Sequence, residues 1–369
     1  MTKPLAMTVG ASQVRVWGMT SQARLARTFD RLGLASADLA SLPADAAGVV
    51  LVHAGWIYDE AVIRALAERP GVALVDAAGR PVAAHVPAVQ AAAAAERLLA
   101  GEALPGVPTL TAIELSGAYN HALRKREAPI LEPLTQDNVR AVEKRLFQGS
   151  YKGVTDLVTK YVWPTPARIV TRWCALAGIT PNQVTMASLA LVFVAMYLFW
   201  TGHFGWGLAA AWVMTFLDTV DGKLARVTLN SSPFGNIFDH GIDLIHPPFW
   251  WWAWWVGLNH LGTPAPFATE TLWVILAGYW LQRGEEWIFL RLFGFHVHAW
   301  RPFDSFFRLI TARRNPNLLL LTGACFFGRP DVGMLLVAAW TAISLVVHLV
   351  QILQAAMKPR GTMVSWLAG

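Results

Sequence analysis

The sequence predicts a polytopic all-α membrane domain, with six transmembrane helices and an interfacial amphipathic helix, preceded by a small N-terminal α/β cytoplasmic domain. Two observations indicate this fold class. The chain of 369 residues is 55% hydrophobic and only 15% charged, with 18 Trp and 18 Phe. Apolar runs of roughly 20 residues, the length that crosses a hydrocarbon core, follow one another only after about residue 185. We therefore expect an α/β domain at 1–110, a helical linker at 111–150 and the membrane domain at 151–369.

The first 110 residues combine short apolar runs typical of strands with amphipathic segments typical of helices. The N-terminus lacks the apolar stretch of a cleavable signal peptide, so we expect this domain to stay in the cytoplasm. Residues 111–150 are polar and mostly helical, with breaks at Pro129 and Pro133, and are expected to form a linker. The expected strands are 13–18, 48–53, 72–76 and 81–86, the last two turning at Ala78-Gly79, and the expected helices are 21–32 and 59–68.

The membrane domain begins with an amphipathic segment, 155–177, which carries basic residues among apolar ones and is expected to lie in the interface with a kink at 163–166. Thr180-Pro181-Asn182 predicts the start of the first span, because Thr or Asn can cap a helix and Pro suits its first turn. The fifth expected span is short for a bilayer about 30 Å thick. The six expected spans are 184–203, 206–228, 234–257, 270–292, 315–328 and 332–356.

The basic residues beside these spans fall mostly on one side, which the positive-inside rule identifies as cytoplasmic, with both termini inside. The net charge of +6 therefore indicates membrane orientation and anionic lipid, and not nucleic acid. The aromatic block 249–255 is interpreted as a lipid-facing or interfacial belt. The opposite side carries His203, His260 and Arg329. The cytoplasmic side carries Arg168, Arg172, Lys223, Arg226, Arg291, Arg301, Arg308, Arg313, Arg314, Lys358 and Arg360.

Four aspartates lie at the cytoplasmic ends of the second and third spans. Asp218 and Asp221 are three residues apart and Asp239 and Asp243 four apart, so each pair lies on one helix face. The two spans are antiparallel neighbours, and the pairs can face each other. Four carboxylates in an apolar segment are costly and repel one another unless a cation offsets them. Because the ligands are oxygens, with no His or Cys at matching spacing, they favour Mg²⁺ or Mn²⁺, with room for two ions.

Small residues accompany the aspartates. Gly222, Ala225 and Gly235 allow close approach of a ligand, such as a planar base with its diphosphate, but taken singly they are equally explained as helix-packing positions. A cation-coupled membrane transporter is an alternative use of the acidic cluster. Broken helices at the midplane and inverted repeats would favour it, whereas the acids gather at one membrane face and no repeat is evident.

The pattern D-x-x-D-G-x-x-A-R-x8-G-x-x-x-D-x-x-x-D, from Asp218 to Asp243, matches the signature of the CDP-alcohol phosphotransferase (CDP-alcohol phosphatidyltransferase) family. The resemblance covers about residues 150–356. It implies a transferase of phospholipid or related phosphodiester biosynthesis in a membrane of the bacterial inner-membrane type. The donor would be CDP-diacylglycerol or a CDP-polyol, the acceptor an alcohol, and CMP the product released. Homodimers are common in this family.

The resemblance also implies roles for individual residues. Asp218, Asp221 and Asp239 would be the principal metal ligands. Asp243 would be the base that takes the acceptor's proton, and is a further candidate ligand. The remaining signature positions would border the CDP moiety; they are Gly222, Ala225, Arg226 and Gly235.

The acceptor stays open among inositol phosphate, glycerol phosphate, inositol and a lipid alcohol. An anionic acceptor needs cations, and Arg172, Arg283 and Arg313 are the residues selected for this role. The wider set of candidates comprises Lys152, Arg172, Arg283, Arg301, Arg308, Arg313 and Arg314. Arg283 with Glu285 and Glu286 is equally explained as an internal ion pair, and the basic cluster 312–315 as an orientation anchor.

Residues 14–90 are similar to the core of sugar-nucleotidyltransferase-like domains. His53-Ala54-Gly55 stands where such domains carry a metal-binding Asp, and the Gly-rich nucleotide loop is missing, which predicts an inactive remnant. An active cytidylyltransferase that makes the CDP donor is the alternative.

Overall fold

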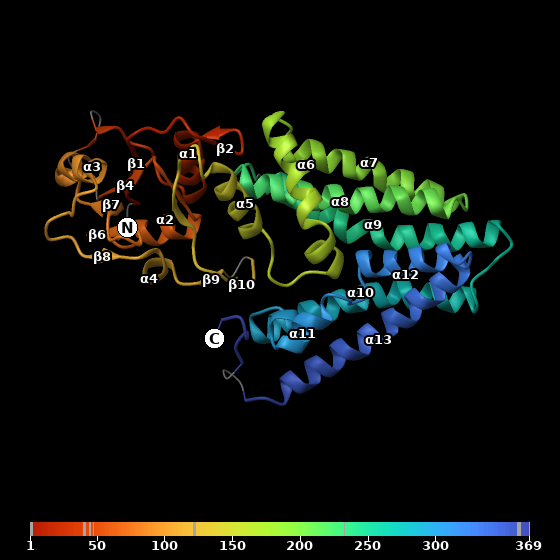
Figure 1. Ribbon diagram of the computed structural model, residues 1–369. Coiled ribbons are helices and arrows are strands. Elements are labelled where there is room, and N and C mark those ends of the chain that lie inside the picture. The colour runs from red at the N-terminus through yellow and green to blue at the C-terminus, as the bar shows by residue number, and fades with distance from the viewer. Residues whose placement is uncertain are drawn as a thin grey trace. The chain divides into compact units, whose positions relative to one another are not determined.

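The structure is a computed structural model that describes residues 3–39, 42–43, 46, 48–120, 123–231, 233–359 and 363–368. The chain divides into two compact units (Figure 1). The first comprises Met1–Asn120, Arg126–Tyr151 and Arg226–Asn230. The second comprises His121–Lys125, Lys152–Ala225 and Ser231–Gly369.

A five-stranded mixed sheet, in the order β1-β4-β7-β6-β8, forms the centre of the first unit. β1 pairs parallel with β4 and β6 parallel with β8, while β7 pairs antiparallel with both β4 and β6. The strands are β1 (Leu5–Val9), β4 (Val49–His53), β6 (Val72–Val75), β7 (Pro81–Val86) and β8 (Thr109–Leu110).

Helices cover both faces of this sheet, which explains the unbroken apolar run of β4. Val50 and Val52 pack with helices α1 (Ser21–Leu32) and α2 (Glu60–Ala67). Val49 and Leu51, whose side chains point the opposite way, pack with α3 (Ala91–Ala100). A strand buried on both faces has no polar alternation.

Several expected elements of the first unit are confirmed. The helix 21–32 is present with the expected bounds; the Thr20 hydroxyl caps it by accepting from the Ala23 N–H, and Gly33 ends it in the left-handed conformation. The paired strands 72–76 and 81–86 are present as β6 and β7. The sequence pattern did not indicate β1 or α3, and the strand expected at 13–18 is reduced to β2 (Arg15–Val16), which pairs with β3 (Met19–Thr20).

Residues 111–150 contain short strands as well as helices. β11 (Leu131–Pro133) pairs antiparallel with β5 (Trp56–Tyr58), and the Glu143 carboxylate accepts a hydrogen bond of 2.9 Å from the Trp17 N–H. The other elements here are α4 (Ala112–Ser116), β9 (Tyr119–Asn120), β10 (Lys125–Arg126) and α5 (Val139–Gly149).

Long helices form the second unit, within a few residues of the six expected. In this bundle α7 packs on α9, α13 packs on α10 and α12, and α9 also packs on α10. The long helices are α7 (Pro181–Trp200), α8 (Phe204–Val227), α9 (Pro233–His260), α10 (Ala268–Phe293), α12 (Arg314–Phe326) and α13 (Pro330–Ala356). The shorter ones are η3 (Val158–Val162), α6 (Pro164–Leu176), η4 (Val297–Ala299) and α11 (Pro302–Phe307).

Local sequence explains where these helices begin. Thr180 and Gln183 form a reciprocal capping box at the start of α7, with Pro181 in its first turn, which confirms the expected cap. Pro164 begins α6 directly after η3, so the kink expected at 163–166 is a break between two helices.

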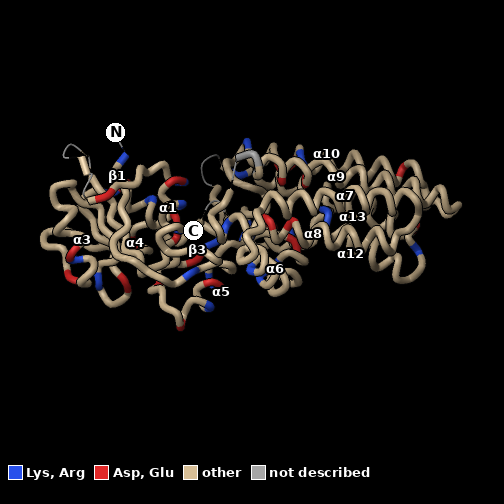
Figure 2. Tube along the Cα trace, turned by 90° about the horizontal axis from the view of Figure 1, so that it is seen from above, with Lys and Arg blue, Asp and Glu red and all other residues tan. Residues whose placement is uncertain are grey.

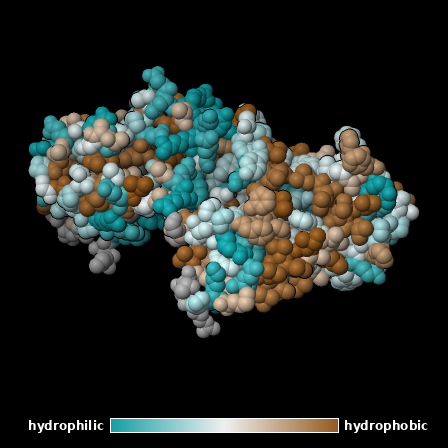
Figure 3. Space-filling view, turned by 60° about the horizontal axis from the view of Figure 1, so that its bottom comes forward, coloured by the Kyte–Doolittle hydropathy of each residue, from teal (hydrophilic) through white to brown (hydrophobic). Residues whose placement is uncertain are grey.

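Two helices, α7 and α13, are long and apolar enough to cross a membrane among the residues that the structure describes. α12, with 13 residues, is shorter than the roughly 20 that span a hydrocarbon core. On the face seen in Figure 3, hydrophobic side chains gather over the helical unit. Arg360, expected on the cytoplasmic side, lies outside the described residues.

The aromatic block of α9 corrects one expectation. Trp250, Trp251 and Trp254 are each at most 1% exposed and belong to the core of the bundle. Two of the buried indole N–H groups have partners, since Trp250 donates to the Val192 carbonyl at 2.9 Å and Trp254 to the Pro330 carbonyl at 3.2 Å. Only Phe249, which is 51% exposed, fits the predicted lipid-facing belt well.

Gly257 marks the closest approach of α9 to α7. A Cβ at this position would collide with the Phe199 carbonyl oxygen, which is backbone and cannot rotate away. Gly257→Ala should therefore destabilise the folded protein by about 1–3 kcal/mol, measured as a lower midpoint of thermal unfolding in detergent.

Gly323→Ala is the matched control, because a Cβ on Gly323 of α12 meets nothing within 4 Å. It should leave stability unchanged or raise it slightly through helix propensity. Equal effects of the two substitutions would contradict the close approach.

Candidate active site and metal centre

The structure brings the expected acidic residues together. Asp218 and Asp221 lie on α8, and Asp239 and Asp243 lie on α9. One carboxylate oxygen from each of Asp218, Asp221 and Asp239 lies within 4.8 Å of the others, a group that can hold a metal ion. Figure 2 shows acidic positions beside α8 within the helical unit. The expected facing of the two helices is confirmed.

Asp221 is the most deeply buried of the four, at 2% exposed. Thr185 on α7 donates its hydroxyl to Oδ2 of Asp221 at 2.6 Å, whereas Oδ1 is buried and has no hydrogen-bond partner among the described residues. A buried carboxylate oxygen without a partner is strongly disfavoured. A cation bound by this oxygen would remove the penalty, so the residues present fit a metal.

Arg314, the first residue of α12, provides positive charge to the cluster. Its guanidinium donates to Asp218 Oδ2 at 2.6 Å and also to Asp243 Oδ1. The sequence pattern placed Arg314 among the basic residues of the cytoplasmic side and in the 312–315 cluster, but did not identify it as a partner of the aspartates. The one sequence feature that could have indicated this role is its position at the start of a helix too short to span a bilayer. Residue spacing could not pair Arg314 with aspartates that lie 71 and 96 residues away.

The donor set is all carboxylate, which suits Mg²⁺ or Mn²⁺ better than Zn²⁺. His240, next to Asp239, has a side chain that is 66% exposed, with Nδ1 3.8 Å from Asp239 Oδ2. This histidine belongs to the rim of the cluster and is not one of the three grouped ligands.

The other signature residues are adjacent to the aspartates in the same two helices. Gly222 and Ala225 follow Asp221 on α8, Arg226 occupies the last turn of α8, and Gly235 lies in the first turn of α9. Their contact with a CDP moiety stays a prediction.

Two of the three arginines expected at an anionic acceptor lie together. Arg313 donates to both oxygens of Glu286, and Arg283 Nη1 is 3.6 Å from Glu286 Oε2. The alternative of an internal ion pair is thus present in the structure, with Glu286 and not Glu285 as the partner. Arg172 is half-buried on α6, and its role stays a prediction.

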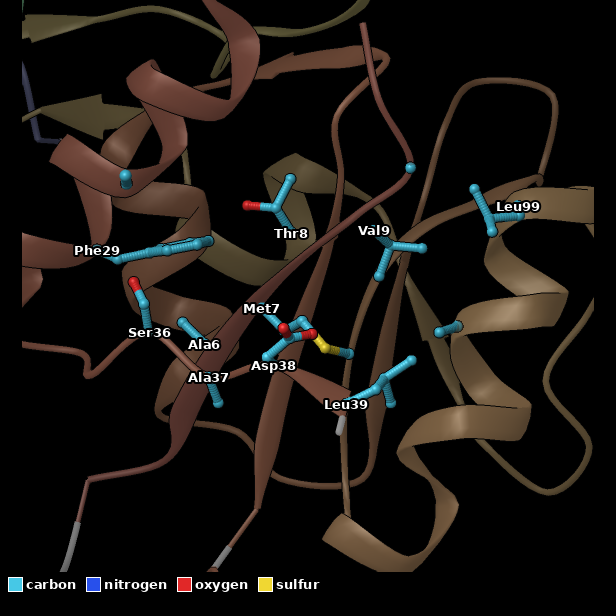
Figure 4. Close-up of a pocket in the computed structure, with 13 residues that line it drawn as sticks. Ala6, Met7, Thr8, Val9, Phe29, Ser36, Ala37, Asp38, Leu39 and Leu99 are labelled. Carbon is cyan, nitrogen blue, oxygen red and sulfur yellow. The ribbon is translucent and has the colours of Figure 1, made fainter. Parts of the chain in front are cut away.

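In the first unit, His53 ends β4 and accepts a hydrogen bond at Nδ1 from the Gly55 N–H at 2.9 Å. Burial lowers the pKa of His53, which favours the neutral ring. A pocket of about 320 Å³ lies beside β1 (Figure 4), and Asp38 is the only charged residue among those that line it. Its lining includes no basic side chain to bind phosphate groups.

The comparisons with known proteins agree with this geometry. Residues 178–310 match the family model described as CDP-alcohol phosphatidyltransferase. The chain is 30% identical over 141 residues to cholinephosphotransferase 1 of Xenopus laevis, which covers 33% of each protein. It is 36% identical over 83 residues to phosphatidylinositol phosphate synthase of Mycobacteroides abscessus, covering 21% of this chain and 38% of that protein. The helical unit therefore carries a domain of the CDP-alcohol phosphatidyltransferase family.

These alignments span well under two thirds of the relatives' length. Among solved structures, phosphatidylinositol phosphate synthase of Mycobacterium tuberculosis in complex with manganese and citrate is similar, with a TM-score of 0.41 and 21% identity, covering 53% of this chain and 93% of that one. The same enzyme with CDP-DAG bound gives a TM-score of 0.39 and 22% identity, covering 53% of this chain and 98% of that one.

The Thr185 hydroxyl should matter for metal binding. Thr185→Val removes the donor to Asp221 at nearly constant volume, and we expect it to weaken Mn²⁺ binding by about 10–100-fold, the usual effect of losing a group that orients a metal ligand. Electron paramagnetic resonance of free Mn²⁺ measures this affinity.

Thr201→Val, at the other end of the first long helix, is the control, because the Thr201 hydroxyl donates to the Tyr197 carbonyl. Thr185→Ser should retain most of the affinity. Unchanged Mn²⁺ affinity in Thr185→Val would show that Asp221 is not a metal ligand.

Proposed function

We propose that this chain is an integral-membrane transferase that moves a substituted phosphate from a CDP-linked donor to an alcohol and releases CMP, in phospholipid or related phosphodiester biosynthesis. One observation carries the proposal: three carboxylates within 4.8 Å of one another, in a region matched to the CDP-alcohol phosphatidyltransferase family. The names of two relatives, a cholinephosphotransferase and a phosphatidylinositol phosphate synthase, support the reaction class.

Asp218, Asp221 and Asp239 would hold Mg²⁺ or Mn²⁺, as one or two ions. A metal bound there neutralises charge on the diphosphate and aligns the attacking and leaving oxygens. The unpartnered Oδ1 of Asp221 supports this role, as does the presence of manganese in the solved M. tuberculosis enzyme. Gly222, Ala225, Arg226 and Gly235 are proposed to border the CDP moiety.

Asp243 is proposed as the general base. Its side chain is 41% exposed, compared with 29% for Asp239 and 16% for Asp218. An acceptor hydroxyl can therefore reach it. The acceptor's proton moves to Asp243, the acceptor oxygen bonds to phosphorus, and the bond from phosphorus to the CMP oxygen breaks, with its electron pair leaving on CMP. Arg314 donates a hydrogen bond to Asp243 Oδ1 and so holds the carboxylate in place.

An anionic acceptor, such as a polyol phosphate, is favoured over a neutral alcohol. Arg283, Arg308 and Arg313 each have a buried guanidinium nitrogen without a hydrogen-bond partner. Burial, together with the charge of Arg313, lowers the pKa of Arg308 to about 9. Crowded, partly unsatisfied guanidiniums fit a phosphate group. Arg172 is proposed as a further contact, while inositol and a lipid alcohol remain the neutral candidates.

Membrane insertion of the second unit is supported by α7 and α13 and by large apolar side chains exposed on them. These include Phe193 at 57% and Val346 at 61% exposed, which lipid would cover. The expected topology, with the aspartates and both termini on the cytoplasmic side, and a homodimeric state belong to the proposal. The first unit is proposed to be an inactive nucleotidyltransferase-like remnant.

Replacing Asp243, the proposed base, should abolish turnover but leave the binding of metal and nucleotide largely intact. Asp243→Asn should lower the rate of CMP release at least about 100-fold, because a positioned base contributes about 10²–10⁴-fold. CMP release is measured with the purified full chain, Mg²⁺, and radiolabelled CDP-diacylglycerol or a CDP-polyol, each with a panel of alcohols.

Asp331→Asn is the control, since Asp331 pairs with Arg329 at the start of α13. Retained Mn²⁺ and CDP binding in Asp243→Asn separates the base role from a ligand role. Absence of CMP release by the unsubstituted protein with every donor and acceptor would refute the proposed reaction.

The acceptor class can be tested through the arginines. Arg283→Gln should raise KM for a phosphorylated polyol at least about 10-fold, with a small effect on KM for neutral alcohols, because a charge-assisted hydrogen bond contributes about 1.5–3 kcal/mol. Steady-state kinetics with inositol phosphate and inositol provide the comparison. Arg329→Gln is the control, and equal effects on both acceptors would contradict an anionic acceptor site.

A further inference from the structure

A second cluster of potential metal ligands lies in the helical unit, apart from the aspartates. Glu286 is on α10, His298 on η4 and His348 on α13. One ligand atom from each lies within 4.8 Å of the others. The three residues come from separate elements, so only the fold brings them together.

The two histidines are buried and incompletely satisfied. His348 is 1% exposed, and neither of its ring nitrogens has a hydrogen-bond partner in the part of the chain that the structure describes. His298 is 3% exposed; its Nε2 lies 3.2 Å from Glu286 Oε1, but its Nδ1 has no partner. A neutral imidazole carries one N–H that needs an acceptor and one lone pair that needs a donor. A buried structural histidine would normally have both.

The carboxylate of Glu285 also has an oxygen without a hydrogen-bond partner among the described residues. Oε2 of Glu285 is buried without a hydrogen-bond partner and lies 3.6 Å from His348 Nδ1, too far for a hydrogen bond. Glu285, His298 and His348 thus each carry a buried unsatisfied atom; His298 and His348 are grouped with Glu286, and Glu285 lies beside His348. Hydrogen bonds among these side chains do not account for them.

We propose that Glu286, His298 and His348 bind a divalent transition metal, with Zn²⁺ the principal candidate and Glu285 the candidate fourth ligand. Two imidazoles with carboxylates are a typical ligand set for Zn²⁺, whereas Mg²⁺ prefers oxygen alone. Such a metal would link α10, η4 and α13. The site is chemically distinct from the all-carboxylate cluster.

The neighbouring arginines should make the site selective for metals that bind nitrogen ligands. Arg313 contacts both oxygens of Glu286, and Arg283 lies 3.6 Å from one of them. Glu286 can bind a metal through one oxygen and keep Arg313 on the other, which orients the ligand. Because the guanidiniums oppose any cation by charge, affinity has to come from nitrogen coordination.

The test uses the full chain in detergent, carrying an affinity tag without histidine, stripped with chelator and equilibrated with ZnCl₂ alone. All proteins in the test carry Asp239→Asn, which weakens metal binding by the aspartate cluster. Metal analysis should find about one tightly bound Zn²⁺ per chain, as expected for a site with three or four protein ligands. His298→Asn and His348→Asn in this background should each lose it, while His203→Asn, an exposed histidine outside the cluster, should retain it.

X-ray absorption at the zinc edge gives a readout that does not depend on the folding of the histidine variants. The Asp239→Asn protein should show imidazole scattering from about two histidines around the bound zinc. Absence of tight zinc, or zinc with oxygen ligands only, would overturn the proposal. Neither result would affect the proposed transferase reaction, which is measured by CMP release with Mg²⁺.

Discussion

The helical unit depends on the charge balance of four carboxylates held between α8 and α9. Carboxylates so close together repel one another, and in an apolar bundle water cannot screen them. Thr185 supplies a hydroxyl from α7, and Arg314 supplies a guanidinium from the start of α12. Four helices, α7, α8, α9 and α12, therefore contribute to one acidic cluster. The unsatisfied oxygen of Asp221 is the position where a bound metal would complete the charge balance.

Two consecutive arginines pair with two separate acidic groups in the interior of the bundle. Arg314 pairs with Asp218 and Asp243, whereas Arg313 pairs with Glu286. Because both belong to the chain at the beginning of α12, a movement of this helix start would change both ion pairs together.

Local patterns predicted much of the architecture. Helical spacing placed the aspartates in two facing pairs, and the Thr180 cap with Pro181 predicted the start of α7. The strand β1 was missed because five residues near the N-terminus become a strand only by pairing with β4. The tryptophans of α9 were misjudged because composition cannot distinguish an aromatic side chain that faces lipid from one that faces a neighbouring helix.

The sequence by itself predicted the cluster of four aspartates, because it depends on residue types at fixed spacing along two helices, and its resemblance to a known family led to the proposed reaction class. Only the tertiary structure decided the partners of those aspartates. Arg314 and Thr185 lie 96 and 36 residues from the carboxylates to which they bond. The same holds for Glu286, His298 and His348, which meet only because α10, η4 and α13 pack together. Contacts between distant segments follow from packing, and packing leaves no local signal in one sequence.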